Sequence, residues 1–142
     1  MSAPFSIVGI DHVVIRAKDI GTMLDFYQRI LGCTMERSIE SIGLFQLRAG
    51  RSLIDLVDVD GELGRKGGAA PGPDAHNMDH LCIRVDPWDA EAIHAYLKGA
   101  DVDAGPVETR NGAEGEGPSI YLDDPEGNMV ELKGPAFDTS SA

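Results

Sequence analysis

Several features are scarce in this chain of 142 residues, and each scarcity excludes a class of protein. No apolar run approaches the eighteen or so residues of a membrane-spanning helix. The first residues lack the charged and apolar regions of a signal peptide, so we expect a cytoplasmic protein. Lysine and arginine number 12 against 24 aspartates and glutamates, and the net charge of −12 argues against nucleic acid and anionic membranes as partners.

Cysteine is also scarce, because the chain has only Cys33 and Cys82. They lie far apart in the sequence, so we expect reduced, partly buried thiols and no disulfide. The length of the chain suits one domain, or two fused half-domains that share a core. It is sufficient to bury a sizeable core without covalent cross-links.

The chain does contain an internal sequence repeat. Residues 10–16 are Ile-Asp-His-Val-Val-Ile-Arg, and residues 78–84 are Met-Asp-His-Leu-Cys-Ile-Arg. Each copy begins a module, and the two modules end in similar tetrapeptides. These are Leu-Ile-Asp-Leu at 53–56 and Met-Val-Glu-Leu at 129–132. Internal repetition fixes the architecture before any other feature does. Each half therefore supplies one histidine near its start and one carboxylate near its end.

Hydrophobic periodicity and turn residues predict the same order of elements in both modules, with a single domain over residues 1–142. In module 7–59 we expect a strand at 7–17, a helix capped by Asp19 and ended by Gly32, and strands near 33–39, 43–48 and 52–59. The segment 60–77, rich in Gly, Ala and Pro, is the predicted linker. In module 78–134 we expect a strand at 78–86, a helix from Pro87 to about 98 that buries Ile93, Tyr96 and Leu97, strands near 105–110, 117–123 and 128–133, and a loose tail at 135–142.

Two acids stand out because strand alternation turns them toward the inner face of an apolar strand. These are Asp55 and Glu131, and an inward carboxylate is costly unless it is paired or bound to a metal. Their position at the matching ends of two modules, each led by His12 or His80, indicates compensation by one divalent cation. Imidazole with carboxylate suits Zn, Ni, Mn or Fe(II) better than Mg or Ca.

Each of these residues also has a structural alternative. His12 and His80 could be core histidines with satisfied hydrogen bonds, and Glu131 could be an exposed acid on an edge strand. Asp55 could act through water instead of touching the metal. Asp11, which precedes the first histidine, and its counterpart in the second module should face outward, capping turns or pairing with arginines.

Further side chains lie near the predicted ligands. Arg16 and Arg84 share the strand face of the histidines, where they either form salt bridges or bind a substrate carboxylate through a bidentate fork. Tyr121 is a candidate for substrate binding, although alternation alone does not identify its face as the cavity. The Gly-rich loop 109–118 either closes over a cavity or is plainly flexible.

Two tandem βαβββ modules containing DHVVIRAKDIGTMLDFYQRILG at 11–32 and SIYLDDPEGNMVEL at 119–132 resemble the vicinal-oxygen-chelate superfamily, which includes glyoxalase I, extradiol dioxygenases and the fosfomycin-resistance and bleomycin-binding proteins. The resemblance covers residues 7–134. It implies an α+β fold of two half-open barrels with a metal inside the concave surface. The four ligands of glyoxalase I then fall on His12, Asp55, His80 and Glu131, where Asp55 departs from the usual Glu.

Three classes of function follow from this resemblance. A glyoxalase-like lyase or isomerase would use Glu131 and Asp55 as catalytic bases beside the metal. An Fe(II) ring-cleaving dioxygenase would use two histidines and Glu131, but the chain is short and offers no further acid–base histidine. A non-catalytic antibiotic binder would not need four ligand-type residues. We therefore expect a metal-dependent enzyme of the first class, acting on a small oxygen-chelating substrate and forming a homodimer.

Overall fold

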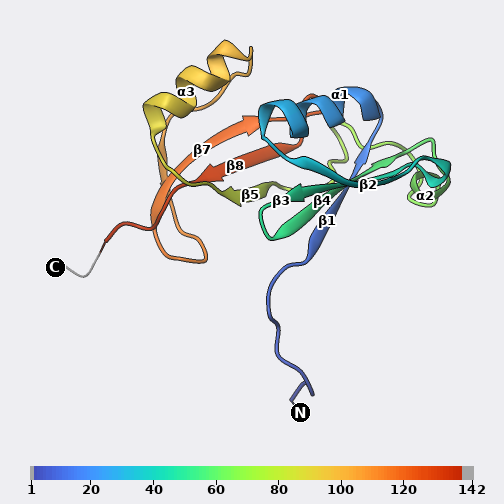
Figure 1. Ribbon diagram of the computed structural model, residues 1–142, viewed down its shortest axis with the longest axis horizontal. Coiled ribbons are helices and arrows are strands. Elements are labelled where there is room, and N and C mark those ends of the chain that lie inside the picture. Colours follow the sequence, from blue (N-terminus) through green and yellow to red (C-terminus); the bar gives the residue numbers. More distant parts are fainter. Residues whose placement is uncertain (1, 139–142) are drawn as a thin grey trace. The chain divides into compact units, whose positions relative to one another are not determined.

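Two compact units, residues 1–70 and 71–142, make up the computed structural model, which describes residues 2–138 (Figure 1). We call them unit 1 and unit 2. The boundary between them lies within the segment 60–77. Each unit contains one four-stranded sheet.

Unit 1 has its sheet strands in the order β1-β4-β3-β2, with β1 parallel to β4 and the other pairs antiparallel. Its elements are β1 (His12–Ala17), α1 (Ile20–Asp25), the π-helical turn η1 (Phe26–Ile30), β2 (Thr34–Ile39), the 3₁₀ turn η2 (Glu40–Ile42), β3 (Leu44–Ala49), β4 (Ser52–Asp58) and α2 (Glu62–Arg65). Strands β2, β3 and β4 lie within one residue of their predicted bounds.

Helix α1 begins at a cap that the sequence predicts. The Asp19 carboxylate accepts a hydrogen bond from the Thr22 amide at 3.0 Å, and Gly32, with a φ of 80°, follows the end of the helical segment. Helix α1 contacts β4, so the sheet face that carries Ile15 and Ala17, both 0% exposed, is the apolar one. Alternation along β1 then leaves His12, Val14 and Arg16 on the opposite face.

Unit 2 repeats the strand order as β5-β8-β7-β6, with β5 parallel to β8. Its elements are β5 (Leu81–Arg84), α3 (Ala90–Gly99), β6 (Glu108–Arg110), β7 (Gly117–Asp123) and β8 (Met129–Lys133). The predicted turn between β7 and β8 is confirmed, because the Asp124 carboxylate accepts hydrogen bonds from the amides of Glu126 and Asn128.

Four local predictions differ from the structure, and one of them is the strand expected at 78–86, which covers only Leu81–Arg84. The strand expected at 7–17 begins only at His12, because β4, its described sheet partner, begins at Ser52. The carbonyls of Ile10 and Asp11 still accept hydrogen bonds from Ser52 and Leu53, but strand pairing does not extend to residues 7–9. The expected linker contains the short helix α2. Helix α3 starts at Ala90 with Asp89 as its cap, and Tyr96 is 54% exposed, not buried. Within residues 2–138, no helix is long and apolar enough to cross a membrane.

Candidate metal-binding residues

The two sheets place a histidine and a carboxylate in equivalent positions. In unit 1, Asp55 of β4 pairs with Val14 of β1, two residues after His12. In unit 2, Glu131 of β8 pairs with Cys82 of β5, two residues after His80. Since residues two apart on a strand share a face, each unit presents its imidazole and its carboxylate on one side of a parallel strand pair.

Each histidine is hydrogen-bonded by the aspartate that precedes it. His12 Nδ1 lies 2.7 Å from Asp11 Oδ1, and His80 Nδ1 lies 2.6 Å from Asp79 Oδ1. A carboxylate only accepts, so Nδ1 donates and the neutral ring keeps a lone pair at Nε2, the state that binds metals. Asp11 and Asp79 face outward as expected, and the charge of Asp11 acts on Arg48, but the described hydrogen bond of each goes to the histidine that follows it. The repeated Asp-His dipeptide was the signal for this role.

The hydrogen bond to Asp11 has an electrostatic consequence. It raises the pKa of His12 above its ordinary value of 6.5, against a smaller opposing effect of desolvation, and the charge of Asp55 adds to the increase. His12 and Asp55 therefore lie close enough to interact electrostatically. A positive charge between Asp11 and Asp55 is favoured, whether a proton on the ring or a cation bound to it.

Asp55 combines burial with a carboxylate oxygen that has no hydrogen-bond partner among the described residues. Its side chain is buried, at 2% exposed, and Oδ2 accepts a hydrogen bond from Gln46 Nε2 at 3.1 Å. Its other oxygen, Oδ1, is buried without any hydrogen-bond donor among the described residues. A buried carboxylate oxygen without a partner is costly, and metal coordination would remove that cost. The donor set of unit 1 thus fits a divalent ion.

In unit 2, the histidine and the carboxylate also lack a donor between them. His80 Nε2 lies 3.2 Å from Glu131 Oε1. Because His80 donates from Nδ1 to Asp79, a neutral ring has only a lone pair at Nε2, and two acceptors then face each other. That contact is favourable only when a proton or a cation lies between them. The pair fits the same class of ion as the pair in unit 1.

Glu131 is buried, at 4% exposed, yet it is held in the charged form. Burial is the largest influence and raises its pKa, but hydrogen bonds from Ser119 and Tyr121 and the charges of His80 and Lys133 outweigh it, so the pKa lies below its usual value. Ser119 Oγ donates to Glu131 Oε2 at 2.6 Å. The register of β7 and β8 pairs Tyr121 with Glu131, which places the tyrosine on the ligand face.

The two arginines of the repeat have different surroundings. The Arg16 guanidinium donates to the backbone carbonyls of Gly64, Gly68 and Ala69 at 2.7–3.0 Å and so holds the chain after α2. Arg84 Nε donates to the Glu114 carboxylate at 2.6 Å. Substrate binding by Arg16 stays a prediction, but its described contacts give it a structural task.

Sequence reasoning missed several neighbours of the carboxylates. They are Gln46 beside Asp55, and Ser119 and Lys133 beside Glu131. Alternation was sufficient to find Lys133, which lies two residues after Glu131 on the same strand. Within residues 2–138, no three His, Cys, Asp or Glu side chains gather into a metal-binding group, so each unit by itself offers a pair of donors.

Comparison with known proteins places the chain in a family. Residues 9–132 match the model of the Glyoxalase/Bleomycin resistance protein/Dioxygenase superfamily. Virulence protein STM3117 of Salmonella typhimurium is 32% identical over 126 residues, covering 87% of this chain and 81% of that protein. The Glyoxalase domain-containing protein RDO1 of Mycosarcoma maydis is 30% identical over 134 residues, covering 89% of this chain and 68% of that protein.

Solved structures agree with the fold. The crystal structure of STM3117 superposes with a TM-score of 0.74 at 27% identity, covering 93% of this chain and 100% of that one. A lactoylglutathione lyase from Agrobacterium tumefaciens, the antibiotic binding protein TnmS3 from a Streptomyces species and the fosfomycin resistance protein FosX from Listeria monocytogenes have TM-scores of 0.65–0.67 at 20–22% identity, over 90–93% of this chain and 91–99% of theirs. They share the fold alone, and the predicted α+β class of paired modules is confirmed. The chain belongs to the Glyoxalase/Bleomycin resistance protein/Dioxygenase superfamily.

Proposed function

We propose that this protein is a metal-dependent enzyme that acts on a small oxygen-chelating substrate, with chemistry of the lyase or isomerase type. One divalent ion per chain, Zn, Ni, Mn or Fe(II), would be held by His12, Asp55, His80 and Glu131. The observation that carries the proposal is Asp55 Oδ1, a buried carboxylate oxygen that has no donor among residues 2–138 and lies beside a histidine whose Nε2 is available. A buried carboxylate oxygen without a partner is costly, and coordination of a cation would remove that cost.

The bound ion would supply Lewis acidity, polarising the oxygens of the substrate. The residues of the chain would do the rest. Glu131 is charged at neutral pH and held in place by Ser119, so it is suited to accept a proton from a carbon beside a carbonyl. Tyr121, which also bonds to Glu131, has a pKa above its usual value, chiefly through desolvation, and stays protonated as a donor.

Metal content and thermal unfolding test the proposal. Protein purified without added metal should contain one ion per chain, and a ligand at a thousandfold excess over its dissociation constant stabilises the native state by about 4 kcal/mol. His12→Ala and Glu131→Ala should lose this stabilisation. His76→Ala, which removes an exposed histidine outside the predicted set, should retain it.

Activity then separates the reaction classes. The metal-loaded protein should convert hemithioacetals or related hydroxycarbonyl substrates. Ring cleavage of catechols with Fe(II) would instead support the dioxygenase alternative. Tight binding of an antibiotic by metal-free protein, without turnover, would support a binding protein. No bound metal and no chelator-sensitive unfolding would disprove the proposed function.

A further inference from the structure

Unit 2 contains a cavity beside the His80–Glu131 pair. It has a volume of about 280 Å³ and is lined by that pair, by Cys82, Arg84 and Lys133, and by loop residues 111–114. This volume lies just below the range of about 300–1,000 Å³ that drug-sized ligands occupy. The cavity therefore suits a small molecule.

Two cations lie next to each other on the cavity face of the sheet. The register of β5 and β8 pairs Arg84 with Lys133, directly after the pair of Cys82 with Glu131. Like charges on directly paired strand residues repel each other. The corresponding pair in unit 1 is Arg16 with the apolar Val57, and Arg16 there is bound to backbone carbonyls. The doubled cation is thus particular to unit 2.

Lys133 is a buried cation whose described hydrogen bonds go to neutral groups. Its side chain is 5% exposed, and Nζ donates to the carbonyls of Arg110 at 2.5 Å and Gly117 at 3.4 Å. No carboxylate among the described residues lies within ion-pair distance of it. An ammonium has three donors, so one remains for a ligand. The charge of Glu131 acts on Lys133 only from beyond ion-pair distance, so an anionic ligand in the cavity would be its direct charged partner.

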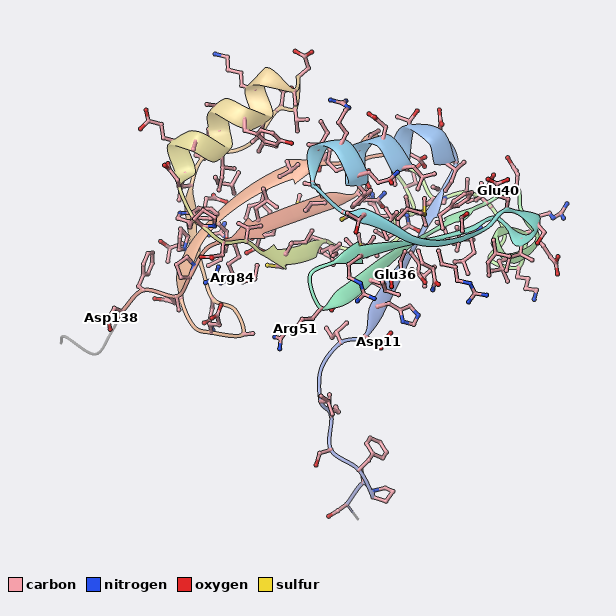
Figure 2. The ribbon with its side chains drawn as sticks, viewed as in Figure 1. Asp11, Glu36, Glu40, Arg51, Arg84 and Asp138 are labelled. Atoms are coloured by element: carbon pink, nitrogen blue, oxygen red, sulfur yellow. The ribbon has the colours of Figure 1, made fainter. Side chains whose placement is uncertain are left out.

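Arg84 is held by a carboxylate that is easily exchanged. Its partner Glu114 is 57% exposed and lies on the loop between β6 and β7, while Arg84 itself is 37% exposed. Figure 2 labels Arg84. Ion pairs this open to water contribute little to stability, so a ligand carboxylate could replace Glu114 at small cost. The same loop covers Lys133, because a Cβ built on Gly112 would lie 2.6 Å from Lys133 Cε.

We propose that this cavity binds the carboxylate of a small organic anion. The guanidinium of Arg84 and the ammonium of Lys133 hold the carboxylate, Glu114 leaves Arg84 when the anion enters, and the oxygens at the other end of the substrate face His80 and Glu131. The role of that second end rests on the proposed function, whereas binding of the carboxylate does not. In a chain with a net charge of −12, such a local pair of cations is required to attract an anion.

Binding of pyruvate and of its neutral analogue pyruvamide to metal-free protein, passed over a chelating resin, tests the proposal by calorimetry. We expect pyruvate to bind at least about tenfold more tightly than pyruvamide, since only the former makes charge-assisted hydrogen bonds. Arg84→Gln should weaken pyruvate binding by at least about tenfold. Glu114→Gln should tighten it about two- to fivefold by removing the competing carboxylate.

Arg51→Gln is the matched control, because it removes one positive charge from the exposed turn between β3 and β4 of unit 1 (Figure 2). It should leave pyruvate binding unchanged. Equal affinities for pyruvate and pyruvamide, equal effects of Arg84→Gln and Arg51→Gln, or no pyruvate binding below about 10 mM would overturn the proposal. If the parent protein binds no metal but still binds pyruvate more tightly than pyruvamide, the proposed function alone is disproved.

Discussion

Asp55 is buried and has an oxygen without a hydrogen-bond partner among the described residues. Its replacement should therefore have opposite effects on the stability of metal-free protein and on metal affinity. Asp55→Asn keeps an oxygen for Gln46 and removes a buried charge, so metal-free protein should become more stable by about 1 kcal/mol. The same variant should lose metal affinity about as strongly as Glu131→Ala if Asp55 touches the ion, and only about 10–100-fold if it acts through water.

Urea unfolding of metal-free protein and metal titration measure the two effects. Asp60→Asn is the control, because it removes one negative charge at an exposed position and reports the general relief of a net charge of −12. If Asp55→Asn changes neither stability nor metal affinity relative to Asp60→Asn, Asp55 has no part in a metal site.

The pairing of His12 with Asp11 predicts a dependence on pH. The pKa of His12 is raised above 6.5 in the folded protein, so the pair stabilises metal-free protein fully below pH 6.5, and the contribution is lost as pH rises through the raised pKa. Metal binding needs the neutral ring and follows the opposite trend, weakening as pH falls through the same value.

Asp11→Asn should lower the pKa of His12 toward 6.5, which an NMR titration of the ring protons measures directly. Metal binding should then persist to lower pH, although with reduced affinity at pH 8, since a carboxylate partner makes the ring a better ligand. An unchanged titration midpoint in Asp11→Asn would show that the hydrogen bond between Asp11 and His12 does not form in solution.

At this scale, the sequence was informative where a pattern occurs twice. The repeat identified the histidines and the acids, and alternation placed each pair on one strand face. It could not identify Gln46 or Ser119 as partners of the carboxylates, because those contacts depend on the register between strands that are distant in the sequence. Their distances follow only from the folded sheets.

Among the elements, two glycines should respond to alanine with opposite signs. A Cβ on the buried Gly64 of α2 would lie 1.9 Å from the carbonyl oxygen of Asp58 and 2.5 Å from Val59 Cα, and backbone atoms cannot move aside cheaply. Gly64→Ala should destabilise the protein by about 1–3 kcal/mol or more. Gly99, in the last turn of α3, has open space around the new Cβ, so Gly99→Ala should stabilise by about 0.5–1 kcal/mol.

Urea unfolding of both variants beside the parent chain gives the comparison. Helical glycine-to-alanine changes are favourable unless a contact opposes them, so each variant controls for the other. A neutral Gly64→Ala would mean that α2 does not pack against the end of β4 as described.

The ends of helices and strands were predictable where turn residues mark them. They were less predictable where pairing with a distant strand sets them. Asp19, Gly32 and the turn after β7 lie as predicted because their side chains or φ angles act locally. The start of β1 depends on the length of β4, which the periodicity of residues 7–17 cannot reveal. Tyr96 belongs to the same predicted apolar stripe of α3 as Leu97, but its side chain is exposed. Periodicity identifies an apolar stripe, but it does not give the width of the surface that covers the stripe.

For the whole molecule, we predict a homodimer in which apolar side chains meet and charges lie at the rim. The residues before β1 expose large apolar side chains, with Ile7 86% and Ile10 81% exposed, and such surfaces are normally covered. With a net charge of −12 per chain, added salt should leave the dimer intact or tighten it, because screening weakens the repulsion.

Light scattering across a dilution series at low and high salt measures this association. The double change Ile7→Lys and Ile10→Lys should weaken the dimer although it reduces the net negative charge. Phe137→Lys, at another exposed apolar side chain, should not. A monomer mass at micromolar concentration in both conditions would contradict the prediction.

The equivalent registers of β1 with β4 and of β5 with β8 also bear on how such a protein evolves. A duplicated gene inherits two copies of the histidine–carboxylate pair, each fixed by a parallel strand pair, while the connections 40–43 and 111–116 lie outside it. Mutation can change the length or the residues of one of these loops without moving the histidine–carboxylate pair. Selection can therefore retain the ancestral chemistry in the duplicated framework and change what is recognised through a single loop, which is one route by which descendants of one ancestor acquire unrelated substrates.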